Sequence, residues 1–392
     1  MTAKRWFVLF ISFIILCLLA IVGGNYFIDP FGYFRGQNGE CDTLDENYYM
    51  REIKAQHIRN NSDEYTAYVI GGSKAGALRT DKLEELDGNS YYNTWVLSGN
   101  FQDYYYYTKY IIKEAKPKKI LLHISTTELK SYSRETYGDI YEIPAVVKGE
   151  SKTNEVFRFL FKNLSASMDE LKTDRSVDFY PLYRTGERNL TKYYNYLNEH
   201  PDTYYHDLME AESTKYLNYI TDGVKDNSNV ISLCLNDLKE IQKLCSKNDV
   251  ELQVIMAPVF IGELVRYEGP YLYEFMEQLT QITGGFWCFN NLNDYALNPF
   301  NFYNTTHYYY ESGDLMVDAM KGEKTPEEFG IYLTMDNIGN YIRNRKAKYE
   351  EIKNYYKKNG TLPLKSYDDP STLMKESKKQ LTIQHKMDQL HK

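Results

Sequence analysis

The chain has 392 residues, of which 43% are hydrophobic and 26% are charged, and its formal net charge is −8. Such a composition supports a packed core and excludes an intrinsically disordered chain. The negative charge and the lack of a sustained stripe of Lys and Arg argue against nucleic acid as the main partner, because phosphates are neutralised by clustered basic side chains. The length allows one large domain with insertions or two smaller domains.

The 39 tyrosines and the five cysteines narrow the class further. Tyr offers a flat apolar ring and a hydroxyl, which suits interfaces and sugar-binding clefts, although ordinary core and surface positions account for the same count. The cysteines are scattered, with no CxxC pair and no metal-ligand spacing, so we expect structural thiols, no bound metal and no cofactor. An exported chain without a disulfide framework is typical of a Gram-positive or anaerobic bacterial surface.

The N-terminus carries a candidate membrane helix. Residues 6–24 contain no charge, and nineteen such residues are enough to cross a bilayer core of about 30 Å. Lys4 and Arg5 precede this segment, so residues 1–5 are predicted to form a cytoplasmic stub and the bulk of the chain to be extracellular, on a single-pass anchor in the cell membrane. A cleaved signal peptide is the alternative; the length of the run and the lack of an A-x-A site after it argue against cleavage.

Beyond a juxtamembrane segment at residues 25–62, short β-rich runs alternate with longer helical patterns. Strands are predicted at residues 65–71, 91–97, 119–124, 251–256 and 286–289. Helices are predicted at residues 74–86, 101–115, 231–246, 272–283 and 312–320. This alternation is typical of βαβ units and predicts, over residues 63–325, an α/β domain with a doubly wound, mainly parallel five-stranded sheet.

Two regions lie outside this alternation. Residues 130–227 are long and polar, and they predict a helical insertion with one helical patch at residues 156–164. Residues 326–366 are predicted to form a C-terminal helical extension, with a helix over residues 326–356. Residues 367–392 form a charged tail, for which a surface helix and disorder are both consistent with the composition.

Ser73 is the first candidate functional residue, because it follows the first predicted strand directly after Gly71 and Gly72. Glycines allow a sharp turn, and a hydroxyl at the start of the following helix is exposed where the helix dipole favours developing negative charge. Such a serine is a candidate nucleophile. A Ser helix cap after a glycine turn is the alternative explanation.

Two further loops are expected at the same edge, because ligands bind beyond the carboxyl ends of parallel strands. Residues 98–100 (Ser-Gly-Asn) follow the second strand, and the Gly99 N–H could bind an oxyanion formed on Ser73; a turn with a helix cap is the alternative. His307 lies in the loop after the last strand and is the expected base, with Asn304 three positions earlier to orient its ring. A surface histidine is the alternative for His307.

With these loops the chain resembles the SGNH (GDSL-like) hydrolase superfamily. Gly72 and Ser73 match its first motif, Gly99 its second-motif glycine, and the run from Asn304 to His307 its D-x-x-H motif. The closer resemblance is to the membrane-anchored branch, similar to the D-alanyl-lipoteichoic-acid biosynthesis factor and to polysaccharide O-acetylation partners of membrane-bound O-acyltransferases. The N-x-x-x-D-P-F-G stretch of that branch is matched by Asn25, Asp29, Pro30, Phe31 and Gly32, and the resemblance covers about residues 25–320.

The resemblance implies catalytic roles for Ser73, His307 and Asn304, and oxyanion or substrate binding by Gly99, Asn100 and Thr127. The sequence departs from the family at two positions. The Asp of D-x-x-H is Asn304, which can orient a histidine but cannot stabilise an imidazolium by charge, and Asp294 could replace it only if its loop folds back. The third-motif Asn is not evident after the third strand, so Thr127 or a backbone N–H would have to serve.

These features leave three hypotheses. The first is an extracytoplasmic serine esterase or O-acyltransferase that acts on a cell-envelope polysaccharide or teichoic-acid-like polymer, with a membrane-bound O-acyltransferase as partner. The second is a catalytically impaired polysaccharide-binding module, which the tyrosine runs at residues 104–107 and 308–310 favour. The third is a scaffold for envelope assembly.

Overall fold

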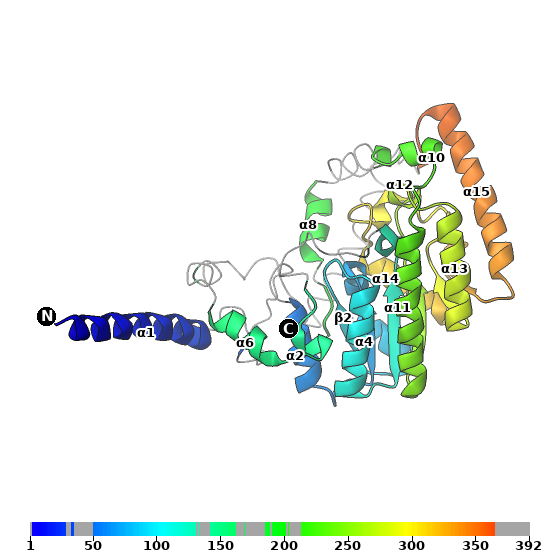
Figure 1. Cartoon of the computed structure of the whole chain (residues 1–392). Coiled ribbons are helices and arrows are strands. Elements are labelled where there is room, and N and C mark those ends of the chain that lie inside the picture. The colour runs from blue at the N-terminus through cyan, green and yellow to red at the C-terminus, as the bar shows by residue number, and fades with distance from the viewer. Residues whose placement is uncertain are drawn as a thin grey trace.

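The fold is α/β, built on one six-stranded sheet with the order β2-β1-β3-β4-β5-β6 (Figure 1). The computed structural model describes residues 2–28, 33–34, 50–130, 132, 142–161, 168, 185–188, 190–200, 203 and 213–364. Its strands are β1 (Ala67–Gly71), β2 (Tyr91–Trp95), β3 (Lys119–Ile124), β4 (Glu251–Met256), β5 (Phe286–Cys288) and β6 (Ile331–Leu333). The first five strands pair in parallel, and β6 pairs antiparallel with β5.

The five predicted strands and their mainly parallel pairing are confirmed, and a sixth strand is added. β6 lies in the segment for which a continuous helix over residues 326–356 was expected, and that prediction is wrong. The strand has three residues, and Ile331 and Tyr332 on it are exposed, so it carries no alternating pattern that would mark it. The sheet therefore continues beyond residue 325, and helix α15 (Ile338–Asn359) begins only after β6.

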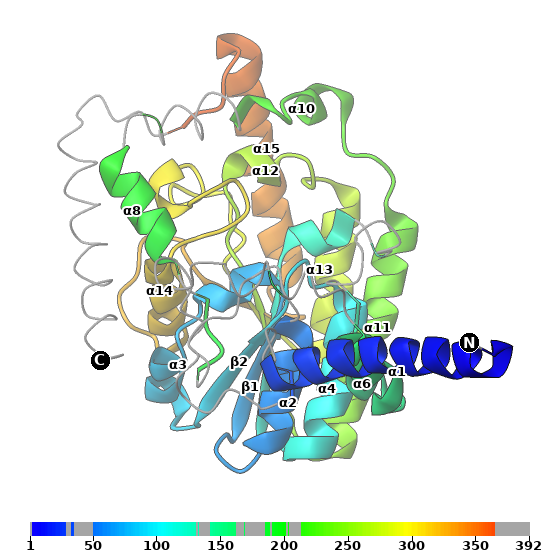
Figure 2. The same ribbon diagram turned by 90° about the vertical axis from the view of Figure 1, so that its left-hand side faces the viewer.

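Hydrophobic clusters cover both faces of the sheet. Successive residues of β1 point to opposite faces, so Ala67 and Val69 belong to one cluster while Tyr68 and Ile70 belong to the other. The first cluster packs against α3 (Thr80–Asp87) and α14 (Tyr310–Met320), and the second against α2 (Met50–Asn60), α4 (Phe101–Ala115), α11 (Ser228–Lys247) and α13 (Pro270–Thr283). Figure 2 shows α3 and α14 on one side of the strands and α4, α11 and α13 on the other. Burial on both faces explains why the central strands β1 and β3 are buried and apolar along most of their length.

The helix expected over residues 74–86 is split into two pieces. A short 3₁₀ helix, η1 (Ser73–Ala77), follows β1, and α3 starts only at Thr80. Arg79 between them is extended, with φ −77° and ψ 129°. The buried Glu187 carboxylate fixes the break, because it accepts the Thr80 N–H at 2.6 Å and the Thr80 hydroxyl at 2.7 Å.

The remaining helical elements are short and lie mainly in or after the insertion. They are η2 (Thr126–Lys130), α5 (Ala145–Lys148), α6 (Lys152–Leu160), α8 (Thr191–Glu199), α10 (Asn218–Asp222), α12 (Ile261–Leu264) and η5 (Pro299–Asn301). Much of the predicted insertion at 130–227, the predicted tail at 367–392 and the matched residues Asp29 to Gly32 lie outside the described residues.

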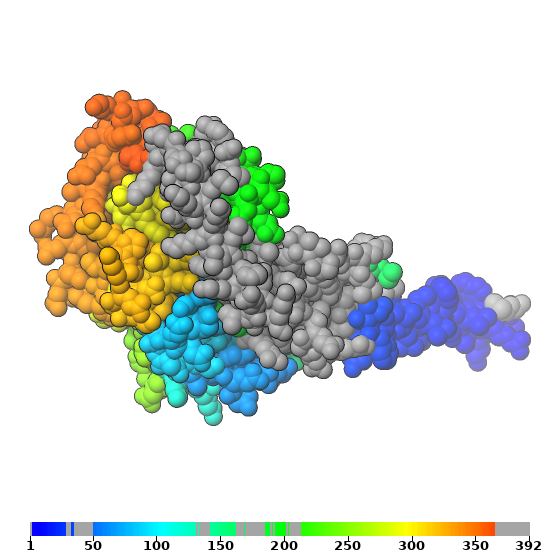
Figure 3. Space-filling view, turned by 180° about the vertical axis from the view of Figure 1, so that it is seen from behind, coloured from blue at the N-terminus to red at the C-terminus, as the bar shows by residue number. Residues whose placement is uncertain are grey.

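Helix α1 (Ala3–Ile28) is, within the described residues, the one helix that is long and apolar enough to cross a membrane. It projects from the body of the molecule (Figure 3). Its inner end contacts α6, where the Asn25 amide donates to the Leu160 carbonyl at 3.0 Å. The rings of Tyr33 and Phe159 stack beside this contact with centroids 3.9 Å apart. The anchor-like helix is thus held against the domain by polar and aromatic contacts.

A buried ion pair fixes the loop that follows β2. Arg51 on α2 contacts Asp103 on α4 at 2.5 Å, both side chains are almost fully buried, and Arg51 also donates to the Leu97 carbonyl at 2.7 Å. Asp103 in turn accepts the Asn100 N–H at 3.0 Å as half of a capping box at the start of α4. The loop between Leu97 and Asn100 is therefore held at both of its ends.

We predict that Arg51→Met lowers the free energy of unfolding by about 3–5 kcal/mol, because it leaves the Asp103 carboxylate buried without its charged partner. Arg59→Met on the same helix is the control, since Arg59 is half-exposed and 3.5 Å from Glu114. That control is expected to cost about 1 kcal/mol or less. Chemical unfolding of the full chain in detergent, followed by circular dichroism, measures both, and equal losses would contradict the prediction.

Candidate active site

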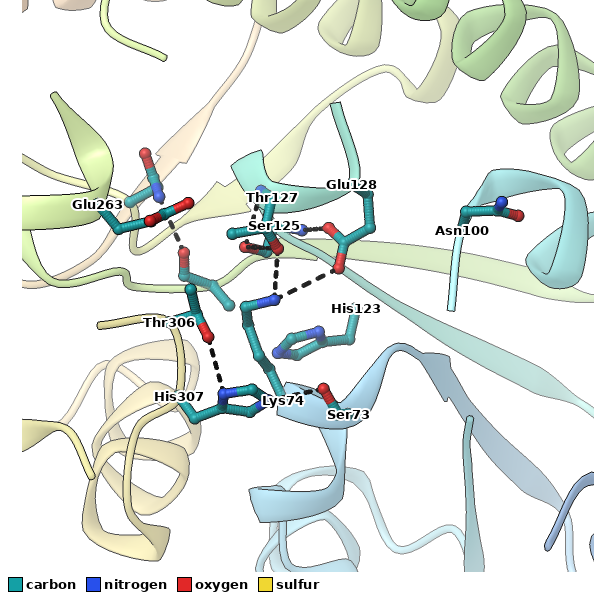
Figure 4. Close-up of polar contacts among 12 residues, drawn as sticks. Ser73, Lys74, Asn100, His123, Ser125, Thr127, Glu128, Glu263, Thr306 and His307 are labelled. Atoms are coloured by element: carbon teal, nitrogen blue, oxygen red, sulfur yellow. Dashed lines mark hydrogen bonds and ion pairs between the residues drawn. The ribbon is translucent and has the colours of Figure 1, made fainter. Parts of the chain in front are cut away.

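The candidate site lies at the carboxyl end of β1, where β2 was added on one side of β1 and the later strands on the other. β1 is paired with β2 on one side and β3 on the other, and Gly71 is in register with both Trp95 and His123. The carboxyl ends of these strands therefore meet at one edge, and the gap between the loops after β1 and β3 is the switch point at which open parallel sheets bind ligands. Figure 4 shows the side chains that gather there.

Ser73 and His307 meet at this edge although 234 residues separate them. The Ser73 Oγ lies 2.6 Å from the His307 Nε2. Ser73 is the first residue of η1, and His307 lies in a loop closed by the bridge between Phe302 and Tyr308. The serine begins a five-residue 3₁₀ turn rather than a long helix, so the expected helix-dipole effect at its hydroxyl does not apply.

Asn304 determines which nitrogen of His307 carries the proton. Its Oδ1 accepts the backbone N–H groups of Thr306 and His307, each at 3.0 Å. Backbone N–H groups only donate, so the atom facing them is the amide oxygen and not the amide nitrogen. The same oxygen lies 2.9 Å from the His307 Nδ1, which must therefore be protonated. Nε2 is left with a free lone pair, and the Ser73 hydroxyl donates to it.

Burial and positive neighbours keep the His307 ring neutral. Burial lowers its pKa well below the usual range, and the charges of Arg188 and Lys74 and the nearby His123 lower it further. Arg188 reaches the site through Tyr303: its Nη1 donates to the Tyr303 hydroxyl at 2.7 Å, and the Tyr303 ring stacks on His307 with centroids 5.2 Å apart. The histidine is thus a base that stays unprotonated at neutral pH.

Three other predicted site residues form hydrogen bonds with groups other than Ser73 and His307. The Gly99 N–H donates to the Val96 carbonyl at 3.2 Å, within its own loop. The Asn100 side chain caps α4 and donates to the Tyr132 carbonyl at 2.9 Å, and Figure 4 shows it apart from the Ser73–His307 pair. The Thr127 hydroxyl accepts a hydrogen bond from Lys74 at 2.5 Å.

Gly99 has a packing role in place of the expected chemical one. A Cβ at this position would lie 3.0 Å from the Gly72 Cα and 2.9 Å from Val96. The neighbouring Ser98 has φ 50°, a left-handed conformation that is costly for a non-glycine residue. The loop after β2 is therefore held tightly against the turn that carries Ser73. Asp294, the alternative partner for the histidine, is exposed, whereas Asn304 contacts the ring directly.

Several side chains at the site had not been identified from the sequence. The Thr306 hydroxyl lies 2.8 Å from the His307 Nδ1 and donates to Asn304. His123, at the end of β3, is fully buried and contacts the Tyr308 hydroxyl at 2.8 Å, and burial lowers its pKa to about 3. Lys74 and Glu128 form a buried pair 3.7 Å apart across the switch point. The position of His123 near the end of an apolar strand could have identified it as a site residue from the sequence. Nothing in the sequence indicated that Lys74 is buried.

No family model matches the chain, and no curated protein matches it. Within the described residues, no three His, Cys, Asp or Glu side chains are grouped so that they could hold a metal ion. Cys234, Cys245 and Cys288 are free and buried, as expected for structural thiols. The chemistry of the site therefore has to be argued from its own geometry.

We predict that Gly99→Ala lowers the free energy of unfolding by about 1–3 kcal/mol, because the added methyl group overpacks the contact with Gly72 and Val96. Gly339→Ala is the control: this glycine is exposed near the start of α15, and a Cβ there meets nothing within 4 Å. The control should be neutral or slightly stabilising, since Ala is the better helix former. Thermal unfolding of both variants measures the difference, and a neutral Gly99→Ala would contradict the close approach.

Proposed function

We propose that the chain is an acyl-transfer enzyme with a serine nucleophile, an esterase or O-acyltransferase. The observation that carries this proposal is the 2.6 Å contact between the Ser73 Oγ and a His307 Nε2 whose lone pair is free. A hydroxyl is a weak nucleophile until a base accepts its proton, and this is the arrangement that supplies the base. The strand order β2-β1-β3-β4-β5 is that of one common doubly wound sheet and supports the SGNH-like architecture.

In the proposed mechanism, the Ser73 proton moves to the His307 Nε2 as the Oγ attacks the acyl carbonyl. The imidazolium then returns the proton to the leaving alcohol, and an acyl-serine remains. A second hydroxyl or water, deprotonated by the same nitrogen, then attacks the acyl-serine. The bond between the acyl carbon and the Ser73 Oγ breaks, the imidazolium returns its proton to the Oγ, and the product is released. Asn304 and Thr306 hold the ring through its Nδ1 during both steps.

The proposed setting is the outer face of a bacterial cell membrane. Helix α1 anchors the chain, and Lys4 and Arg5 before the apolar run keep the N-terminus in the cytoplasm. The acyl acceptor or donor is then a hydroxyl of a cell-envelope polysaccharide or a teichoic-acid-like polymer, and the partner is a membrane-bound O-acyltransferase. These assignments rest on the resemblance and on the anchor.

A serine-reactive fluorophosphonate probe is expected to label the wild-type chain at Ser73. Ser73→Ala should abolish labelling and lower the turnover of a short acyl ester such as p-nitrophenyl acetate by at least about a thousandfold, to the background rate. Ser246→Ala, on the exposed face of α11, is the matched control and should be labelled normally. Labelling that persists in Ser73→Ala would reject the assignment.

The pH dependence of turnover gives a second prediction. Turnover requires neutral His307, and because its pKa is lowered, activity should persist as pH falls through 6.5 and be lost only below that value. Asn304→Asp keeps an acceptor for all the donors that meet the Asn304 oxygen, and its charge stabilises the imidazolium. We expect this variant to raise kcat/KM about 10- to 100-fold and to move the acid limb to higher pH.

Asn340→Asp, on the exposed surface of α15, is the control and should change neither the rate nor the pH profile. A slower Asn304→Asp enzyme, or an acid limb that does not move, would show that residue 304 does not influence turnover through its hydrogen bond to the His307 ring.

A binding module remains a second candidate, and Asn304 is the observation that favours it. The amide offers no negative charge to an imidazolium, and Arg188 and Lys74 oppose its formation. Binding of an envelope polysaccharide by both wild type and Ser73→Ala, with no ester turnover by either, would support this function in place of the enzyme.

A further inference from the structure

Lys74 is a buried ammonium that makes a single hydrogen bond within the described part of the chain. Its side chain is 6% exposed. Among the described residues it makes one hydrogen bond, to the Thr127 hydroxyl, and one ion pair, with Glu128 at 3.7 Å. An ammonium has three N–H donors, so two of them have no acceptor within hydrogen-bonding distance among the residues that the structure describes. A buried charge with unused donors is costly unless a ligand satisfies them.

The acidic neighbours of Lys74 are engaged by other groups. Glu128 accepts the Ser125 N–H, and Glu263 contacts Arg266 at 2.9 Å and the Tyr267 hydroxyl at 3.1 Å. Figure 4 shows the Lys74 ammonium facing Thr127 and Glu128, with His123, Ser73 and His307 around the rest of its side chain. Its positive charge also lowers the pKa of His307 and of His123, and its side chain runs beside Ser73 and both of these rings in Figure 4.

We propose that the Lys74 ammonium binds the carbonyl oxygen of the acyl group and stabilises the oxyanion that forms on it when Ser73 attacks. The donors expected for this role, at Gly99 and Asn100, are directed at the Val96 and Tyr132 carbonyls instead. Lys74 directly follows the nucleophile in the chain and has two N–H groups to offer. This inference rests on the proposed acyl-transfer function.

The step is balanced without a further reactant. The bond from the Ser73 Oγ to the acyl carbon forms, the carbonyl π pair moves to oxygen, and the Oγ proton moves to the His307 Nε2. The oxyanion, held by Lys74, then collapses to a carbonyl, the bond to the alcohol breaks, and the imidazolium proton goes to the leaving oxygen. The same groups act in reverse order for the second acyl acceptor.

Lys74→Met tests the proposal in the full chain. Loss of one oxyanion donor is expected to lower kcat about 10²- to 10³-fold with little change in KM, because the contact is formed mainly in the transition state. The rate of fluorophosphonate labelling at Ser73 should fall in parallel, as should the affinity for phenylboronic acid, which forms a tetrahedral anion on a serine. Lys109→Met, on the exposed surface of α4, is the control and should leave all three readouts unchanged.

Two further variants keep the outcome decisive. Lys74→Met combined with Glu128→Gln leaves no unpaired buried charge, so this double variant separates a folding defect, seen in the thermal midpoint, from loss of the donor. Thr127→Val removes the hydroxyl but keeps the ammonium, and less than a tenfold loss is expected.

A loss in Thr127→Val as large as in Lys74→Met would overturn the proposal, because Lys74 would then act only by positioning Thr127. Unchanged kcat in a folded Lys74→Met enzyme that is still labelled would also overturn it. A wild-type chain that is not labelled at all would instead reject the acyl-transfer function itself.

Discussion

The placement of β1 between β2 and β3 is the constraint on which the candidate site depends. This pairing brings the turn after β1 against the loop after β2 on one side and the loop after β3 on the other. The approach is close enough that a Cβ on Gly71 would lie 2.9 Å from the His123 carbonyl. Ser73 has little freedom to move as a result, and His307 reaches it from a loop that is itself closed by a bridge between Phe302 and Tyr308. The strand pairing and this bridge thus hold the Ser73 hydroxyl close to the His307 ring.

The electrostatics of the candidate site are unusual for the proposed pairing of a serine nucleophile with a histidine base. The group that orients the ring is a neutral amide, and the charged groups that act on the ring are Arg188 and Lys74. Such surroundings disfavour the imidazolium and favour negative charge on a ligand. In the proposed reaction the two effects are compatible, because the imidazolium and the oxyanion would form together, and the cations would stabilise the oxyanion while they oppose the imidazolium. The balance between them determines how fast such a site can turn over.

The sequence predicted the part of this molecule that follows from periodicity. Five strands and most of the main helices were found because their apolar residues are buried and recur regularly, whereas two of the three residues of β6 are exposed. The meeting of Ser73 and His307 followed from the rule that parallel strands end at one edge. A sequence pattern does not, however, show where a backbone N–H points. The Gly99 N–H donates to the Val96 carbonyl within its own turn. Asn100 forms a capping box with Asp103, and the three-residue spacing of these two residues already allowed this alternative. Lys74 was overlooked because a lysine beside a turn is usually solvated, and its burial depends on a loop more than 50 residues away.

The contact between Asn25 and Leu160 also limits how far the domain can move relative to helix α1. A domain on a long flexible linker can take many positions above a bilayer, whereas here the last turns of α1 contact α6. With α1 upright in a bilayer, the sheet edge that carries Ser73 would stay at one height and one tilt. Under the proposed function, a polymer substrate would have to be presented at that height, and polymer chains too short to reach it would escape modification.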